Sequence, residues 1–350
     1  MFLEFFGLRE QPFGVSPDPR FLYLGSGHLE ALASLYYGIE ANRGFLALVA
    51  RPGMGKTTLL FHLLQKFSPT ARTAFIFQTQ CNSREFMRFL LAEIGIENDV
   101  QDLVRMHEQF NRCLVQEARA GKRFIVVVDE AQNMDASVLE TVRLLSDFET
   151  PQAKLLQIIL AGQPTLADKL ASPALTQLRQ RITSLSGLSP FSPQETAGFI
   201  SHRLHVAGYK GPALFSPGAL DLMAEASEGI PRQINNYCFH ALTLACAMRK
   251  RTVDGGVVRQ VVNDLDISRF MTDVEATSTL SQLRSQMNLS PDPVLQVPGS
   301  HFEGKDLVEG KDLGKPVLAS HKRAEDNLSP AEAQQHMQDV SRLLRTWRSG

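Results

Sequence analysis

The segment Ala50–Thr57, ARPGMGKT, constrains the fold of this 350-residue chain more than any other feature. It follows a continuously apolar run, Phe45–Ala50, which predicts a fully buried strand of a parallel sheet. It opens Lys56–Phe67, whose apolar spacing predicts a helix. Gly53 and Gly55 let the backbone curl so that successive N–H groups point inward, where the helix N-terminus adds positive potential. The strand–loop–helix context therefore indicates a phosphate-binding P-loop.

The residues of this loop have distinct expected roles. Lys56 is expected to reach the β- and γ-phosphate oxygens, and the Thr57 hydroxyl to ligate Mg²⁺. Ala50 stands where the consensus has glycine, which predicts a tolerated change with a small cost if that position needs a positive φ. The residues expected to bind the nucleotide are Ala50, Arg51, Pro52, Gly53, Met54, Gly55, Lys56, Thr57 and Thr58.

A second motif, FIVVVDE at Phe124–Glu130, is an apolar strand that ends in two carboxylates. At the carboxyl end of such a strand, Asp129 is expected to hold Mg²⁺, directly or through water. Glu130 is expected to orient and polarise the attacking water, because phosphoryl transfer depends mainly on positioning and charge stabilisation. An Asp-Glu strand end alone is weakly diagnostic, but together with the P-loop it favours hydrolysis over a switch.

Three further positions lie where a P-loop enzyme that hydrolyses a nucleotide would need polar or charged side chains. Gln163 follows the predicted strand Leu155–Leu160 and is a candidate sensor of the γ-phosphate, or else a turn residue. Arg179 and Arg181 precede the last strand, and either could enter a neighbouring subunit as an arginine finger. We favour Arg181; a surface salt bridge is the alternative. Arg232, in GIPR at the start of a predicted helix, could contact the γ-phosphate and couple the angle of a lid to the nucleotide state.

Strands alternate with helices as far as about residue 189, which predicts an α/β core with a parallel sheet. One of the expected helices is a single segment over 165–179. After Pro190 only helices are predicted, and Pro193, Pro217 and Pro231 each suit a first helical turn. The expected organisation is an aromatic and proline-rich arm (1–27), a P-loop core (28–189), a helical lid (190–268), a linker (269–328) and an amphipathic helix (329–350).

The two ends of the chain leave alternatives open. The arm is biased to extended and turn conformations by its prolines, and it either only packs or also helps enclose a ligand. The last segment has an S-x-x-E capping box at Ser329–Glu332, followed by an apolar seam from Ala333 to Trp347. That helix either docks on its own domain or binds a partner.

Composition excludes several classes of protein. The net charge of −1 argues against a globally basic nucleic-acid binder. None of the four cysteines forms a C-x-x-C pair, so neither a zinc ribbon nor a disulfide framework is indicated. No run approaches the length of a membrane-spanning helix, and the N-terminus lacks the features of a signal peptide. A cytoplasmic protein is therefore expected, held at the inner membrane only through a partner.

These motifs together resemble an AAA+ ATPase. The N-terminal run MFLEFFGLREQPFGVSPDPRFLYLGSGHLEAL narrows the resemblance to the general secretion pathway protein A family. It covers about residues 1–268, and the other segments that carry it are ARPGMGKTTLL, VVVDEAQNM, LLQIILAGQPTL, LRQRI and GIPRQINNYC. The resemblance implies a three-layer sandwich with sheet order 5-1-4-3-2 and an all-helical lid.

The same resemblance implies an ATPase that uses ATP and Mg²⁺ and assembles into a homo-oligomer, so that Arg181 meets a neighbour's nucleotide. It also implies that hydrolysis remodels or assembles a protein partner linked to secretion or the envelope. The transmembrane and peptidoglycan-binding regions that follow the ATPase in that family are not visible in this sequence. Two alternatives stay open: a DNA-associated ATPase of the transposition-regulator type, less favoured because no dense basic stripe is present, and a non-hydrolysing nucleotide switch or scaffold.

Overall fold

The computed structural model describes residues 2–96, 102–149 and 154–265. The predicted linker at 269–328 and the predicted helix at 329–350 lie outside the described residues.

A five-stranded sheet forms the centre of the first part of the chain, and all its pairings are parallel. The strand order is β2-β3-β4-β1-β5, which confirms the predicted order 5-1-4-3-2 read from the other edge. The strand that precedes the P-loop therefore lies between β4 and β5, and the carboxyl ends of β1, β3 and β4 meet at one edge of the sheet. The strands are β1 Phe45–Val49, β2 Ala71–Ile76, β3 Arg123–Val128, β4 Gln157–Gly162 and β5 Ile182–Gly187.

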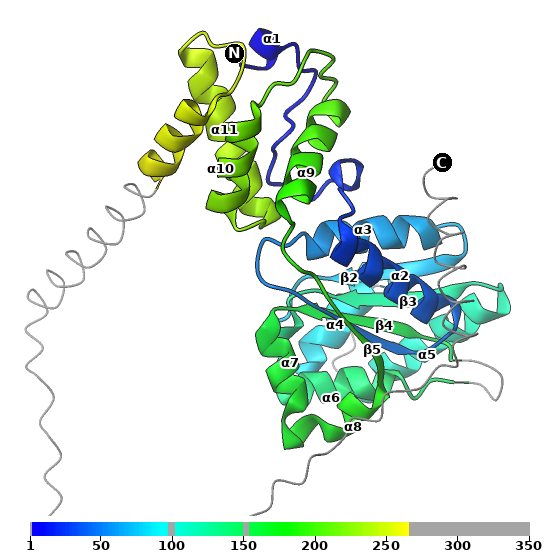
Figure 1. Ribbon diagram of the computed structural model, residues 1–350. Helices are drawn as coiled ribbons and strands as arrows, with labels where there is room; N and C mark the ends of the chain where they lie inside the picture. Colours follow the sequence, from blue (N-terminus) through cyan, green and yellow to red (C-terminus); the bar gives the residue numbers. More distant parts are fainter. Residues whose placement is uncertain (1, 97–101, 150–153, 266–350) are drawn as a thin grey trace, which may run out of the picture. The chain divides into compact units, whose positions relative to one another are not determined.

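Helices cover both faces of the sheet (Figure 1). One face carries α2 (Ser26–Glu40) and α3 (Lys56–Phe67), and the other carries α4 (Ser83–Glu93), α5 (Leu103–Arg119) and α6 (Ala136–Leu145). Alternate side chains of β3 divide between the two faces, because successive residues of a strand point in opposite directions. Those on the second face join one large apolar cluster with α4, α5 and α6. This arrangement gives the predicted three-layer α/β sandwich.

The single helix predicted over 165–179 is wrong. The chain instead forms α7 (Pro164–Ala171), a 3₁₀ turn (Pro173–Leu175) and α8 (Thr176–Arg181). Ser172 is extended, with a ψ of 148°. Proline disfavours helical backbone in the residue before it and lacks an N–H, so Pro173 ends the first helix and starts a turn.

Beyond β5 the described chain is helical. The helices are α9 (Pro193–Val206), α10 (Pro217–Ser227), α11 (Pro231–Ala247) and a helix at 255–265. A proline begins each of the three labelled helices, where its missing N–H would have no helical partner. We call this helical part the lid.

The N-terminal arm packs into the lid. It contains a short helix, α1 (Phe2–Phe6), and a 3₁₀ turn (Pro19–Phe21), where the prolines had suggested only extended and turn backbone. Buried apolar side chains of the arm join the same hydrophobic cluster as those of α9, α10 and α11; they are Phe6, Leu8, Phe13 and Phe21. Among the described helices, none is long and apolar enough to cross a membrane.

Candidate active site

The P-loop joins β1 to α3 and depends on two glycines. Gly53 and Gly55 have φ values of 81° and 86°, in the left-handed region that favours glycine. Ala50 is not among the described residues with positive φ, so its methyl group carries no backbone penalty. Its N–H donates to the Gly162 carbonyl at 3.0 Å, which ties the start of the loop to the end of β4.

Lys56 is the first residue of α3 and is buried, with 6% of its surface exposed. Its Nζ donates to the Ala50 carbonyl at 3.2 Å, so the ammonium group lies within the curl of the loop. Burial lowers the pKa of Lys56, while the carboxylates of Glu130 and Asp129 act in the opposite direction. The loop thus holds a partly desolvated cation close to two acidic side chains.

Thr57 and Asp129 are in direct contact. The Thr57 hydroxyl donates to Asp129 Oδ2 at 2.6 Å, and the Glu130 N–H donates to Asp129 Oδ1 at 2.9 Å. Asp129 directly follows β3 and is 2% exposed. A hydroxyl beside a carboxylate is a hard-oxygen pair that fits Mg²⁺, since this ion is usually held by one or two protein carboxylates together with substrate phosphates. These are the two residues predicted to be metal ligands.

Two amides hold the Glu130 carboxylate. Its Oε2 accepts from Gln132 Nε2 at 2.6 Å and from Gln163 Nε2 at 3.2 Å. Gln132 in turn accepts the Gln163 N–H through its Oε1 at 3.0 Å. Burial raises the pKa of Glu130, but the two amides and the charges of Lys56 and Arg232 outweigh it, so the pKa lies below its ordinary value. The carboxylate is ionised at neutral pH.

Gln132 is a site residue that the sequence analysis did not identify. Glu130 has a φ of 53° and a ψ of 36°, a left-handed conformation that is uncommon for a residue with a side chain. This turn begins a short 3₁₀ helix (Ala131–Asn133) and brings Gln132 back beside Glu130. The DEAQ spacing was the only available signal, and it becomes informative only once that turn is known.

Arg232 is brought to the P-loop by the first turn of α11. Its N–H donates to the Gly53 carbonyl at 3.1 Å, and its side chain lines the same cavity as Lys56 and Glu130. A Cβ on Gly53 would approach Arg232 Cβ to 2.8 Å. The lid and the P-loop therefore meet in backbone contact at this point.

The cavity has a volume of about 370 Å³ and is enclosed by the core, the lid and the arm. Of the residues predicted to bind nucleotide, those at 52–58 line it, and Glu130, Gln163 and Arg232 do so as well. Arg51 is not among the lining residues and is half-exposed, 3.9 Å from Glu228. The remaining walls come from arm residues 14–18 and 21–23, from His28 and from the lid.

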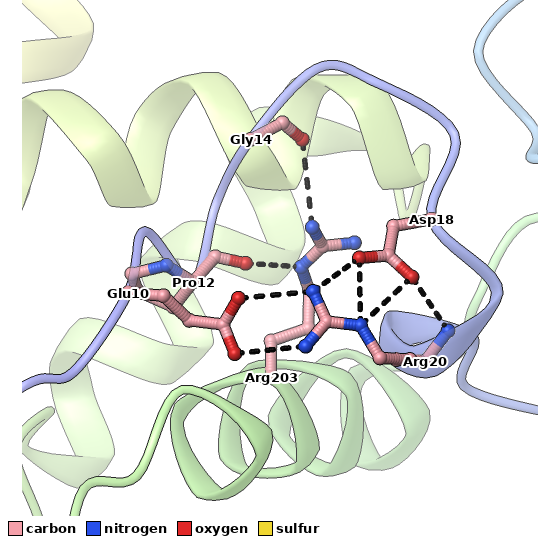
Figure 2. A network of polar contacts seen from close by, with 6 residues as sticks. All are labelled: Glu10, Pro12, Gly14, Asp18, Arg20 and Arg203. Atoms are coloured by element: carbon pink, nitrogen blue, oxygen red, sulfur yellow. Dashed lines mark hydrogen bonds and ion pairs between the residues drawn. The ribbon is translucent and has the colours of Figure 1, made fainter.

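Arg203 of α9 fixes the arm where it lines this cavity (Figure 2). Its Nε donates to the Pro12 carbonyl at 2.5 Å and its Nη2 to the Gly14 carbonyl at 3.4 Å. The guanidinium also lies over the rings of Phe21 and Phe199, at 4.9 and 5.3 Å from their centroids. The arm therefore packs on the lid and also lines the cavity, and its role in enclosing a ligand stays a prediction.

The predicted arginine fingers lie away from this cavity. Arg181 pairs with Asp147 and donates to the Ser146 hydroxyl at 2.5 Å. Arg179 donates to the Ala171 carbonyl at 3.2 Å. Neither lines the cavity of its own chain. A role in a neighbouring subunit stays a prediction.

Known proteins resemble this chain in sequence and in fold. Residues 39–170 match the AAA domain family. General secretion pathway protein A of Aeromonas hydrophila is 41% identical over 254 residues, which cover 71% of this chain and 45% of that protein. An uncharacterized HTH-type transcriptional regulator of Methanocaldococcus jannaschii is 24% identical over 80% of this chain and 79% of its own length. The ORC2 protein of Aeropyrum pernix, solved as ADPNP–ADP complexes, has a TM-score of 0.59 at 18% identity and covers 73% of this chain and 71% of its own.

The sheet order, the P-loop and the Asp-Glu strand end, with the AAA domain match, place this chain in the AAA+ class of P-loop NTPases. More particularly, its sequence is similar to general secretion pathway protein A over 71% of its length, as the sequence motifs predicted. The chain spans less than half the length of that relative.

Proposed function

We propose that this protein binds ATP with Mg²⁺ in the cavity at the P-loop and hydrolyses it to ADP and phosphate. The observation that carries the proposal is the Glu130 carboxylate, held by two amides beside the Thr57–Asp129 pair and the buried Lys56. The solved ORC2 relative, which shares the fold, was prepared as nucleotide complexes.

Phosphate binding rests on the loop and the start of α3. The backbone N–H groups around Gly53 and Gly55 and the N-terminus of α3 provide positive potential for phosphate oxygens. Lys56 adds a point charge, and exchange of the Ala50 carbonyl for a phosphate oxygen would replace a neutral acceptor with a charged one. Arg232 supplies a second cation from the lid.

Thr57 and Asp129 would hold Mg²⁺ through their side-chain oxygens. When bound, the ion neutralises charge on the phosphates. The short hydrogen bond between the two side chains already fixes both oxygens at the mouth of the P-loop.

Glu130 is proposed to orient the attacking water. The water oxygen forms a bond to the γ-phosphorus while the bond to the bridging oxygen breaks, and ADP leaves with that electron pair. The proton of the water passes toward the Glu130 carboxylate. The two amides keep this carboxylate ionised and aimed, and Gln163, beside the γ-phosphate in this scheme, would sense its loss.

Hydrolysis is proposed to drive the assembly or remodelling of a protein partner linked to secretion or the envelope. The name of the Aeromonas relative, a general secretion pathway protein, supports this pathway. We further propose a homo-oligomer in which Arg181, or Arg179, meets the nucleotide of a neighbour. In that scheme the arm, core and lid act together as one ATPase unit on the cytoplasmic side of the inner membrane, and the partner holds them there.

Steady-state hydrolysis by wild type, Glu130→Gln and Lys56→Ala, each over a range of protein concentrations, tests this proposal. Glu130→Gln is expected to keep ATP binding while hydrolysis falls by about 100-fold or more, because an amide cannot accept the proton. Lys56→Ala is expected to lose binding. A rise in wild-type specific activity with concentration would support assembly. Unchanged turnover in Glu130→Gln would overturn the role of Glu130.

A further inference from the structure

The turn that carries Glu130 is held by side chains that lie outside the cavity. Its left-handed backbone is unfavourable for a residue with a side chain, so the surrounding structure must maintain it. Thr79, which follows β2, donates its hydroxyl to the Glu130 carbonyl at 3.1 Å. Lys169 of α7 donates its Nζ to the carbonyls of Gln132 and Met134, at 2.6 and 2.7 Å. Neither Thr79 nor Lys169 lines the cavity.

Lys169 directs its charge at the backbone of this turn. A lysine ammonium has three donors on a flexible stem. Here two of the three donors are directed at carbonyls of one short turn, and the side chain is half-buried. Charge-assisted hydrogen bonds are stronger than neutral ones, and ordering a lysine side chain costs conformational entropy. The two bonds therefore restrict the path of the chain between Gln132 and Met134.

The helix that carries Lys169 also begins at the candidate sensor. Gln163 directly precedes α7, donates its amide to the Glu130 carboxylate and donates its N–H to the Gln132 side chain. Lys169 lies in the last turn of the same helix. One helix thus contacts the turn twice, through side chains at its start and through backbone carbonyls near its end.

The contribution of Lys169 is geometric. The groups that lower the pKa of Glu130 are the two amides and the charges of Lys56 and Arg232, and Lys169 is not among them. We propose that Lys169 is a positioning residue for hydrolysis: it fixes the backbone of the turn at 130–134 and thereby aims the Glu130 carboxylate. This inference rests on the proposed function, since it assumes that Glu130 orients the attacking water.

Steady-state kinetics of Lys169→Met tests this role. Methionine keeps an apolar stem but has no donor, so kcat is expected to fall by about 10-fold or more as the carboxylate loses its aim. Because Lys169 does not line the cavity, KM and Kd for ATP should change by less than about 2-fold. Lys169→Arg retains donors and should restore most of the rate. Lys122→Met removes an exposed lysine and is the matched control. An unchanged kcat in Lys169→Met would overturn the proposal.

A double variant shows whether Lys169 acts through Glu130. In the Glu130→Gln background no carboxylate is left to aim, so adding Lys169→Met is expected to lower the single-turnover rate little further. A general loss of structure would lower the rate by the same factor in both backgrounds. Equal factors would therefore overturn the positioning role.

Hydrogen exchange without nucleotide gives a readout that does not depend on activity. The N–H groups of Asn133 and Met134 donate within this turn, at 3.0 and 3.2 Å. Lys169→Met is expected to raise their exchange rates by about 10-fold, because the turn opens more often, while the amides of β1 at 45–49 exchange as in the wild type. Unchanged exchange at 133–134 would show that Lys169 does not hold the turn.

The outcomes separate this inference from the proposed function. Failure of the wild type to hydrolyse ATP, or unchanged turnover in Glu130→Gln, would overturn both. A large loss in Glu130→Gln with an unchanged kcat in Lys169→Met would overturn the positioning role alone.

Discussion

Arg232 donates its backbone N–H to the Gly53 carbonyl at 3.1 Å, which joins the first turn of α11 to the tip of the P-loop. The contact is possible because Gly53 has no side chain: its Cα faces Arg232 Cβ, and its φ of 81° suits glycine. The lid thus contacts the P-loop through the backbone of Arg232 as well as through its side chain.

Gly53→Ala is expected to weaken ATP binding and to lower the free energy of unfolding by about 1–3 kcal/mol, since the added methyl group meets Arg232 Cβ and strains a left-handed backbone. Thermal unfolding and ATP titration measure both effects. Gly218→Ala is the control, because nothing lies within 4 Å of its new Cβ. Equal stability of the two variants would contradict the tight lid contact.

Removing the amides that hold Glu130 should shift the acid limb of the pH–rate profile. Gln132 and Gln163 stabilise the ionised carboxylate, so Gln132→Ala and Gln163→Ala are expected to raise the pKa of Glu130. Activity that needs the carboxylate is then lost at a higher pH than in the wild type. The pH dependence of kcat measures the shift, with Glu130→Asp as the reference for a displaced carboxylate. Profiles with unchanged acid limbs would show that the amides do not tune Glu130.

Asp129→Asn should abolish the response to magnesium. The amide keeps the shape of the side chain but loses the charge that would hold the ion, so hydrolysis is expected to fall by about 100-fold or more. ATP affinity measured with and without Mg²⁺ should then become nearly equal. Thr57→Ser, which retains the hydroxyl that contacts Asp129, is the matched control and should stay magnesium-dependent.

The P-loop could be predicted from the sequence because it depends on local pattern, whereas the sheet order was implied by the resemblance to a known family. Buried strands, a glycine-rich turn and a helix start lie within a few residues of one another at 45–57, and the strand end at Asp129 has the same local character. At Ser172–Pro173 the apolar spacing suggested that one helix continues, but the proline ends the helix there. The prediction of a single helix was therefore wrong.

The parts of the site that escaped prediction depend on contacts across long stretches of chain. Arg203 donates to the carbonyl of Pro12, 191 residues away. No local pattern shows that a buried arginine on a helix binds a distant segment of the chain. Gln132 reaches Glu130 only because the chain turns left-handed at Glu130 itself. The spacing of residues in the sequence predicts neither the packing of the arm on the lid nor the left-handed turn at Glu130.

The arm should come loose when Arg203 is replaced. Arg203→Met keeps most of the volume but removes both bonds to the arm carbonyls, and it is expected to lower the free energy of unfolding by about 2–3 kcal/mol. Since arm residues line the cavity, KM for ATP should rise more than kcat falls. Thermal unfolding and steady-state kinetics measure these changes. Arg20→Gln is the control: its ion pairs are exposed and screened by solvent, so little change in the free energy of unfolding is expected.

The contact between Glu195 of the lid and Ser26 of the core should weaken at low pH. Glu195 of α9 accepts the Ser26 N–H from α2 at 2.6 Å and the Ser192 N–H at 2.9 Å. These two backbone donors lower the pKa of Glu195 from 4.5 to about 2. Because the pKa in the folded protein is the lower one, its stabilisation is fully present above pH 4.5 and is lost as the pH falls toward 2.

Glu195→Gln is therefore expected to be less stable than the wild type at pH 7, by about 1 kcal/mol, since a neutral amide replaces a charged acceptor. The difference should shrink between pH 4.5 and pH 2, as the wild-type carboxyl is protonated. Denaturant unfolding of both proteins across this range measures the difference, and comparing the two cancels the other carboxylates. Glu225→Gln removes the same charge from an exposed position of the lid and should show no such trend. A stability gap that stays constant down to pH 2 would mean that Glu195 contributes through shape and not through its charge.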